Sequence, residues 1–483
     1  MVHYKRTNKL RRIVGCGVIV ILMMHLSVIY FEKDTYEESA QIQTGSKQGH
    51  LIDRRSQKYN EVNFPCIEPW CVVTCMNFYG AIHGKHLSPE QRIHIAIDKG
   101  LDNETNQLIS QYPPPKTCTY SNISSGASFL RQPYTVNYFP LAFGFIETYL
   151  LGTISHTVYY EDEHQVVNET CIPKKSREFS RLVPGDLTTY EFQFGDEAEY
   201  KRQYMSAYFA LTKKKGGWDC NRHYEIIASA AMPYFENLNE SGSYTLAHLP
   251  KSLLNDARNM YGIKRTEMKL DHAVFNFTHY FILLHRLIYY SRHRLTTRKM
   301  TEYMLKTVNY SQHQNMSARN SVLYISHASP DYMKDLMLHG FTLIFQENLY
   351  VYEPPEFMYK YSSKNTWTFN NTRNYYRKAL YGLGYGYALS LRNYEHLWRR
   401  DKAELSSERV VKQNILHRKY DLIVFGSIIR ENRLFDFVTQ YYEQYRIIVI
   451  DGEDETKDIR RSHYARYAMY FLREIPDDCN KFS

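Results

Sequence analysis

The clearest hydrophobic pattern lies in the C-terminal part of the chain, where short apolar runs alternate with amphipathic stretches. Apolar runs of strand length occupy residues 321–326 (SVLYIS), 348–354 (NLYVYEP), 420–428 (YDLIVFGSI) and 446–454 (RIIVIDGED). Between them, residues 329–345 and 434–445 repeat apolar positions at helical spacing. Continuous apolar strands separated by helices are typical of a parallel sheet covered on both faces. The pattern therefore predicts a Rossmann-like α/β lobe over residues 316–483.

Polar side chains follow three of these predicted strands at the point where each strand ends. They are Ser326, His327 and Asp331 after the first, Gly426, Ser427 and Arg430 after the third, and Asp451, Glu453 and Asp454 after the fourth. In open parallel sheets, ligands bind outside the carboxyl ends of the strands. We therefore expect a binding site among these residues.

A second pattern, at residues 206–235, predicts a strand, a glycine turn, a helix and another strand. The run SAYFALTKK leads into Gly216 and Gly217, Asp219 is a good N-cap for a helix over 220–231, and MPYF begins the next strand. A helix N-terminus after a glycine turn offers free backbone N–H groups and the positive end of the helix dipole. Such an end attracts a phosphate group.

The charged residues of this unit fit an anionic ligand. Lys213, Lys214 and Lys215 precede the glycines, and Arg222 and Glu225 fall on one face of the predicted helix. A carboxylate one turn beyond a pyrophosphate site can accept hydrogen bonds from both hydroxyls of a ribose. The alternative is an ordinary amphipathic helix with a capping aspartate and solvated lysines.

The N-terminal region predicts a membrane anchor. Residues 13–31 (IVGCGVIVILMMHLSVIYF) are long and apolar enough to span a bilayer, residues 1–12 before them carry only basic charges, and acidic residues follow. This asymmetry places residues 1–12 in the cytosol and the rest outside it. A cleavable signal peptide is the alternative. Residues 32–60 are polar and fit a stem, and residues 61–315 then form a first α/β lobe.

Sequons, cysteines and charge fit this topology. Eight N-x-S/T triplets follow the apolar segment, at Asn103, Asn122, Asn168, Asn239, Asn276, Asn309, Asn315 and Asn370. Seven cysteines lie on the same side, where disulfide bonds are expected, and because the number is odd, one stays free or pairs between chains. The net charge of +9 is spread among 51 acidic residues, so nucleic-acid binding is not indicated.

The motif at residues 209–235, together with LPKSL at 249–253, resembles the donor-lobe signature of exostosin-like and related GT-B glycosyltransferases. This resemblance implies that the basic loop (Lys214, Lys215, Gly216, Gly217) and Arg222 bind the diphosphate of a nucleotide sugar. It also implies that Glu225 binds the ribose. Weaker likeness extends over residues 135–310 and 320–475.

Two features depart from that family. Ala230 and Ala231 stand where such enzymes keep a glycine before the proline strand. The glutamate-bearing lobe also precedes the complete Rossmann-like lobe, whereas it normally comes second. Either the lobes are permuted in sequence, or the architecture is not true GT-B.

The resulting expectation is a type II membrane glycosyltransferase of the Golgi or endoplasmic reticulum, with two Rossmann-like lobes. It would move a sugar from a nucleotide-sugar donor to a glycan or glycoprotein acceptor and would need no metal or other cofactor. An inverting transfer needs a general base near the acceptor hydroxyl. We expect Asp331 in that role, with His327 as the second choice.

Two alternatives remain open. Asp451, Glu453 and Asp454 follow a buried strand, as do the carboxylates that hold a divalent cation in metal-dependent glycosyltransferases. The chain could also be a membrane-anchored ectodomain that binds glycans and catalyses nothing. Its support is the large number of tyrosines, 44 residues, and the density of sequons.

Overall fold

The computed structural model describes residues 102–120, 133–146, 155–159, 166–170, 172–173, 175–190, 192, 197–310, 320–360, 390–454, 458 and 460–482. These residues all fall in one compact unit, Phe64–Ser483. The predicted tail, membrane segment and stem (residues 1–12, 13–31 and 32–60) lie outside the described residues. Within the ranges described, no helix is long and apolar enough to cross a membrane.

The larger sheet has seven strands in the order β1-β2-β14-β13-β12-β10-β11. Their bounds are β1 (Lys116–Tyr120), β2 (Tyr134–Pro140), β10 (Val322–Ile325), β11 (Leu349–Tyr352), β12 (Leu422–Phe425), β13 (Ile447–Asp451) and β14 (Met469–Leu472). All neighbouring pairs are parallel except β1 and β2. The predicted α/β class with a mainly parallel, Rossmann-like sheet is confirmed, and the four apolar runs contain β10 to β13.

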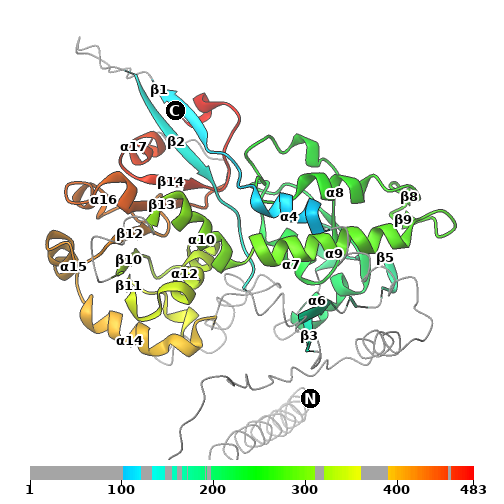
Figure 1. Ribbon diagram of the computed structural model, residues 1–483, viewed down its shortest axis with the longest axis horizontal. Coiled ribbons are helices and arrows are strands. Elements are labelled where there is room, and N and C mark those ends of the chain that lie inside the picture. The colour runs from blue at the N-terminus through cyan, green and yellow to red at the C-terminus, as the bar shows by residue number, and fades with distance from the viewer. Residues whose placement is uncertain are drawn as a thin grey trace, which may run out of the picture. The chain divides into compact units, whose positions relative to one another are not determined.

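The apolar runs show no polar face because both faces of this sheet are covered. Along β13, Ile448 and Ile450 belong to one hydrophobic core, while Ile447 and Val449 belong to the other. The first core includes residues of α12 (Tyr332–Phe345), and the second includes residues of α15 (Glu408–Leu416), α16 (Phe435–Val438) and α17 (Arg460–Tyr467). α14 (Glu395–Glu404) packs beside β11 (Figure 1).

A smaller parallel sheet of three strands lies earlier in the chain. Its order is β5-β6-β7, with β5 (Arg177–Phe179), β6 (Ala207–Thr212) and β7 (Met232–Phe235). The helices of this region are α4 (Asp102–Ser110), α6 (Glu197–Met205), α7 (Asn221–Ala228), α8 (Lys251–Arg258), α9 (Phe277–Arg294) and α10 (Thr297–Thr307). Two antiparallel hairpins complete it, β3 (Ser155–Tyr159) with β4 (Val166–Thr170) and β8 (Ile263–Lys264) with β9 (Lys269–Leu270). The predicted strand–turn–helix–strand unit is thus confirmed as β6, α7 and β7.

The two predicted lobes, 61–315 and 316–483, share one sheet. β2 pairs in parallel with β14, so the earlier region supplies two strands to the sheet of the later one (Figure 1). A disulfide bond between Cys118 and Cys479 joins β1 to the C-terminal segment. A boundary near residue 315 therefore does not separate the two sheets.

Candidate functional site

A cavity of about 620 Å³ lies where the α7 region meets the carboxyl ends of the large sheet. One part of its lining comes from residues 215–225, and another from residues 330–333, Arg430 and residues 452–454. Among the parallel strands the order reverses between β10 and β12, which is where ligands bind in doubly wound sheets. The volume is in the range of small-molecule sites. The two groups of residues singled out in the sequence therefore meet in one place.

Most of the predicted donor residues line this cavity. Lys215, Gly216, Gly217, Arg222 and Glu225 are all among its lining residues. Lys214 is not; its ammonium lies 5.7 Å from the centre of the Trp218 ring. Of the two candidate bases, Asp331 lines the cavity and His327 does not.

The predicted helix cap is wrong. The N-cap residue of α7 is Cys220, without a side-chain capping bond, instead of Asp219. Asp219 is buried and accepts hydrogen bonds from the Phe143 amide (3.0 Å) and the Tyr224 hydroxyl (3.2 Å). Asp219 therefore links the segment after β2 to α7. Its carboxylate bonds to these distant groups instead of capping the helix.

The glycine bend contacts an anion that belongs to the protein itself. The Asp219 amide donates to Glu474 Oε1 at 2.8 Å, and Arg473 donates to the Asp219 carbonyl. A Cβ on Gly217 would collide with Glu474 and Arg473, and one on Gly216 would collide with Asp454. The close approach of these side chains explains the two glycines. The Asp219 amide is therefore not available to an anionic ligand of the cavity.

Two cations on the cavity wall are available for such a ligand. Within the described part of the chain, the side chains of Arg222 and Lys215 have no hydrogen-bond or ion-pair partner, and Arg222 Nη1 is buried without one. Arg473, by contrast, is paired with Asp454 (2.5 Å) and Glu474 (3.1 Å). A half-buried guanidinium without a partner is costly in a folded protein. An anion in the cavity would remove that cost.

The carboxylate of Glu225 is held in place by a tyrosine pair. It accepts a hydrogen bond of 2.6 Å from the Tyr200 hydroxyl, which lies 3.3 Å from the Tyr204 hydroxyl. Burial raises the pKa of Tyr200 well above its usual range, and the charge of Glu225 adds to this. Tyr200 therefore stays a neutral donor that orients Glu225. Neither tyrosine was identified from the sequence.

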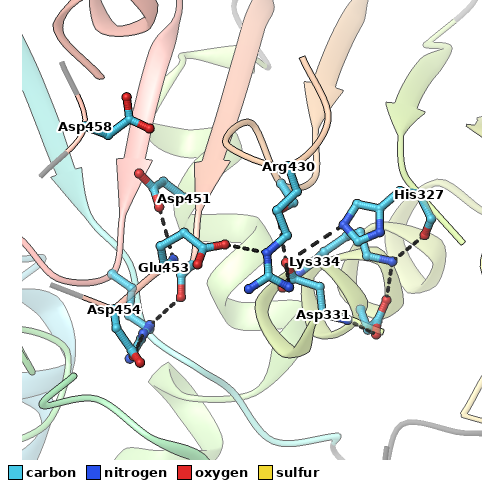
Figure 2. A network of polar contacts seen from close by, with 12 residues as sticks. His327, Asp331, Lys334, Arg430, Asp451, Glu453, Asp454 and Asp458 are labelled. Carbon is cyan, nitrogen blue, oxygen red and sulfur yellow. Dashed lines mark hydrogen bonds and ion pairs between the residues drawn. The ribbon is translucent and has the colours of Figure 1, made fainter. Parts of the chain in front are cut away.

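The carboxyl ends of β10, β12 and β13 are linked by a polar network (Figure 2). Asp331 Oδ2 accepts from Ser427 Oγ at 2.9 Å and lies 3.3 Å from Arg430 Nη1, while Asp331 Oδ1 caps α12 at the Lys334 amide. Arg430 Nε also donates to Glu453 at 2.5 Å. The predicted residues after the three strands thus lie together.

His327 lies next to this network with a free nitrogen. Its Nε2 is buried 4.0 Å from Asp331 Oδ2, without a hydrogen-bond partner among the described residues. Burial, with Lys334 as the next cause, lowers the pKa of His327 to about 4. The imidazole is therefore neutral at physiological pH.

Arginines hold the three carboxylates of the metal-dependent alternative. Asp451 Oδ2 accepts from Arg461 Nε (2.8 Å) and from the Tyr470 hydroxyl (2.7 Å), while Glu453 and Asp454 pair with Arg430 and Arg473. A guanidinium competes with a cation for the oxygens of the carboxylate that it pairs with. The described residues contain no group of three or more such side chains that could hold a metal ion.

The alanine that departs from the family pattern has a conformational explanation. Ala230 follows α7 with φ 53°, the left-handed region in which glycine is favoured at the end of a helix. It is fully buried and does not line the cavity. A glycine at this position would serve the helix end instead of donor access.

We expect Glu474 to make stability fall with rising pH. Burial, partly opposed by Arg473, raises the pKa of Glu474 from 4.5 to about 7. The folded state therefore binds this proton more tightly than the unfolded state, and the free energy of unfolding falls as pH rises from 4.5 through about 7. Glu474→Gln should flatten this fall by up to about 3 kcal/mol.

Urea unfolding of the parent and of Glu474→Gln, followed at several pH values between about 5 and 8, measures the difference. Burial also raises the pKa values of Asp335 and Asp401 to about 6, so some slope remains in the variant. Parallel profiles for the two proteins would show that Glu474 titrates normally.

Three comparisons with known proteins give no further guide to this site. No protein-family model, no curated protein and no solved structure matches the chain.

Proposed function

We propose that the protein is a glycosyltransferase that uses a nucleotide-sugar donor and binds it in this cavity. The observation that carries the proposal is the lining of the cavity. Two cations without partners, Arg222 and Lys215, share it with a fixed carboxylate, Glu225, and with the carboxylate of Asp331 on another wall. A nucleotide sugar combines a dianionic diphosphate, a ribose diol and a reactive sugar, and each of these requires one of the three features.

On the donor side, Arg222 and Lys215 bind the diphosphate and stabilise the charge that develops on it as it leaves. Glu225 accepts hydrogen bonds from the ribose hydroxyls, and Tyr200 keeps its carboxylate in one orientation. Gly216 and Gly217 line the cavity beside these cations and give the diphosphate room to approach the backbone. The Asp219 amide does not take part, because the Glu474 carboxylate accepts its hydrogen bond.

On the acceptor side, Asp331 is the general base. The acceptor oxygen attacks the anomeric carbon, the bond from that carbon to the diphosphate breaks, and the diphosphate leaves with the electron pair. The acceptor proton moves to Asp331. In the free protein, Asp331 forms an ion pair with Arg430 and accepts a hydrogen bond from Ser427. Arg430 lines the cavity and pairs with Glu453 (2.5 Å) as well as Asp331, so it holds the candidate base at the cavity wall.

The fold and the setting fit this proposal. A three-stranded parallel sheet and a mainly parallel seven-stranded sheet flank the cavity, as two α/β lobes do in GT-B enzymes, with the glutamate-bearing region first in the chain. The Cys118–Cys479 disulfide and the exposed sequon residues Asn239, Asn276 and Asn309 support a lumenal position. We therefore propose a type II protein of the Golgi or endoplasmic reticulum, anchored by residues 13–31, whose acceptor is a glycan or glycoprotein.

A non-catalytic glycan-binding ectodomain is the second candidate. The observation that favours it is that both oxygens of Asp331 already accept hydrogen bonds, one from the Lys334 amide and one from Ser427. The two candidates differ in one product. Incubation with nucleotide sugars and glycan acceptors releases nucleoside diphosphate from a transferase and none from a binding protein.

The expected effect of Glu225→Ala tests the donor role. Nucleoside diphosphates should raise the melting temperature of the parent, because a ligand that binds only the folded state stabilises it by mass action. The variant should lose most of this increase, measured from its own baseline, since hydrogen bonds to a charged group contribute about 1.5–3 kcal/mol each. Glu267→Ala, at an exposed position outside the cavity, should behave as the parent. Equal stabilisation of both variants would reject the ribose role.

A further inference from the structure

A buried ion pair lies directly beneath the loop that carries the candidate base. Lys334 and Asp335 are in the first turn of α12, and both side chains are 0% exposed. Lys334 Nζ lies 2.8 Å from Asp335 Oδ1. Neither residue lines the cavity.

This pair holds both ends of the segment from His327 to Asp331. Lys334 Nζ donates to the His327 carbonyl at 2.8 Å (Figure 2). Asp335 Oδ2 accepts from the Asp331 amide at 3.0 Å. The pair is itself fixed to the sheet, because the Tyr324 hydroxyl on β10 donates to the Lys334 carbonyl at 2.8 Å. One ionic contact thus determines where the segment begins and where it ends.

Stability alone does not explain an ion pair at this depth. Removing two charges from water costs about as much as their attraction returns, and apolar side chains of similar size often stabilise a fold equally well or better. The helix is also capped independently, because Asp331 Oδ1 accepts from the Lys334 amide. What apolar side chains could not supply is the donor for the His327 carbonyl and the acceptor for the Asp331 amide.

We propose that Lys334 and Asp335 are positioning residues for Asp331. This inference rests on the proposed function, in which Asp331 takes the acceptor proton. The clamped segment places Asp331 Oδ2 2.9 Å from Ser427 Oγ and 3.3 Å from Arg430, at the wall of the cavity. A displacement of about 1 Å in a catalytic group can slow a reaction about 100-fold. Both side chains act through the backbone of the segment and not on a substrate.

The test uses a paired substitution that avoids a buried lone charge. Lys334→Met/Asp335→Leu removes both charges and keeps the volume, so the double variant should fold, with a melting temperature lowered only by the loss of the two backbone hydrogen bonds. Amide hydrogen exchange of residues 327–331 should be at least tenfold faster, while kcat should fall about 100-fold with the donor KM unchanged. Lys334→Met/Asp335→Asn restores an acceptor for the Asp331 amide and should recover part of kcat.

A surface pair serves as the control. Lys412 and Glu408 form an exposed i,i+4 ion pair on α15, and their replacement by methionine and glutamine should change neither exchange nor kcat. Unchanged exchange at residues 327–331 in the Met/Leu variant would overturn the positioning role. Faster exchange with unchanged kcat would also overturn it. If the parent transfers no sugar at all, the proposed function fails, and the exchange measurement still decides whether the pair fixes the segment.

Discussion

Replacing Arg222 by alanine is expected to weaken the binding of a nucleoside diphosphate by at least about 30-fold. A charged, partly desolvated partner of an anion typically contributes about 2–5 kcal/mol to binding. Arg222 lines the cavity with a guanidinium that has no partner among the described residues, so its charge is available to the ligand. Titration calorimetry of parent and variant measures the two dissociation constants.

The same substitution should not weaken the ligand-free protein. Because the Arg222 guanidinium is half buried and unpaired within the described ranges, its removal should leave the melting temperature unchanged or raise it. Arg399, which is 71% exposed and pairs with Glu395 on the surface of α14, offers a matched control whose alanine variant should bind nucleotide normally. Similar affinities for the Arg222 and Arg399 variants would remove Arg222 from the site.

Removing the Cys118–Cys479 disulfide is expected to lower the free energy of unfolding by about 2–5 kcal/mol. The bond joins residues 361 positions apart, so it restricts the unfolded chain over most of its length. It also ties β1, at the edge of the large sheet, to the C-terminal segment. Urea unfolding of Cys118→Ala/Cys479→Ala against the oxidised parent measures the loss.

A control substitution at a cysteine without a disulfide bond distinguishes the loss of the cross-link from the loss of a cysteine side chain. Cys220 is the free cysteine among the described residues, and Cys220→Ala removes its side chain without opening a loop. Its effect should be clearly smaller than that of the double substitution. Equal unfolding midpoints for the parent and the double variant would mean that the two cysteines contribute no cross-link in solution.

Strong local patterns predicted much of the fold. The runs that form β10, β12 and β13 are continuously apolar because helices cover both faces of the sheet. A strand that is buried on both faces carries no polar positions, so its apolar run stands out in the sequence. The unit of β6, α7 and β7 was visible because two glycines separate a strand from a helical repeat. In both cases the decisive signal lies within a few residues of the element.

The contributions of distant segments could not be predicted in the same way. β2 alternates polar and apolar residues, and nothing in its sequence indicates that it pairs with β14, more than 300 residues later. β14 begins only two residues after the end of α17, with no glycine or proline between them to mark its start, so Arg473 and Glu474, which follow it directly, were missed. An apolar run that ends in charged residues, MYFLRE, was the available signal.

The candidate site shows the same limit at the level of single atoms. Sequence spacing placed Arg222 and Glu225 on one helix face and Asp331 after a strand, and all three line one cavity. The hydrogen bond between the Asp219 amide and the Glu474 carboxylate was not predictable, because the two residues lie 255 positions apart in the sequence. Local rules favoured a capping role for Asp219, and tertiary contacts decided otherwise.

A crystal structure of the protein with a bound nucleoside diphosphate would test the central claim most directly. The proposal predicts the diphosphate within about 3 Å of Arg222 and Lys215, with the ribose hydroxyls at the carboxylate of Glu225. It also predicts space for a sugar between the diphosphate and Asp331. A nucleotide bound elsewhere, or a cavity that stays empty at saturating concentration, would contradict the assignment of a donor site.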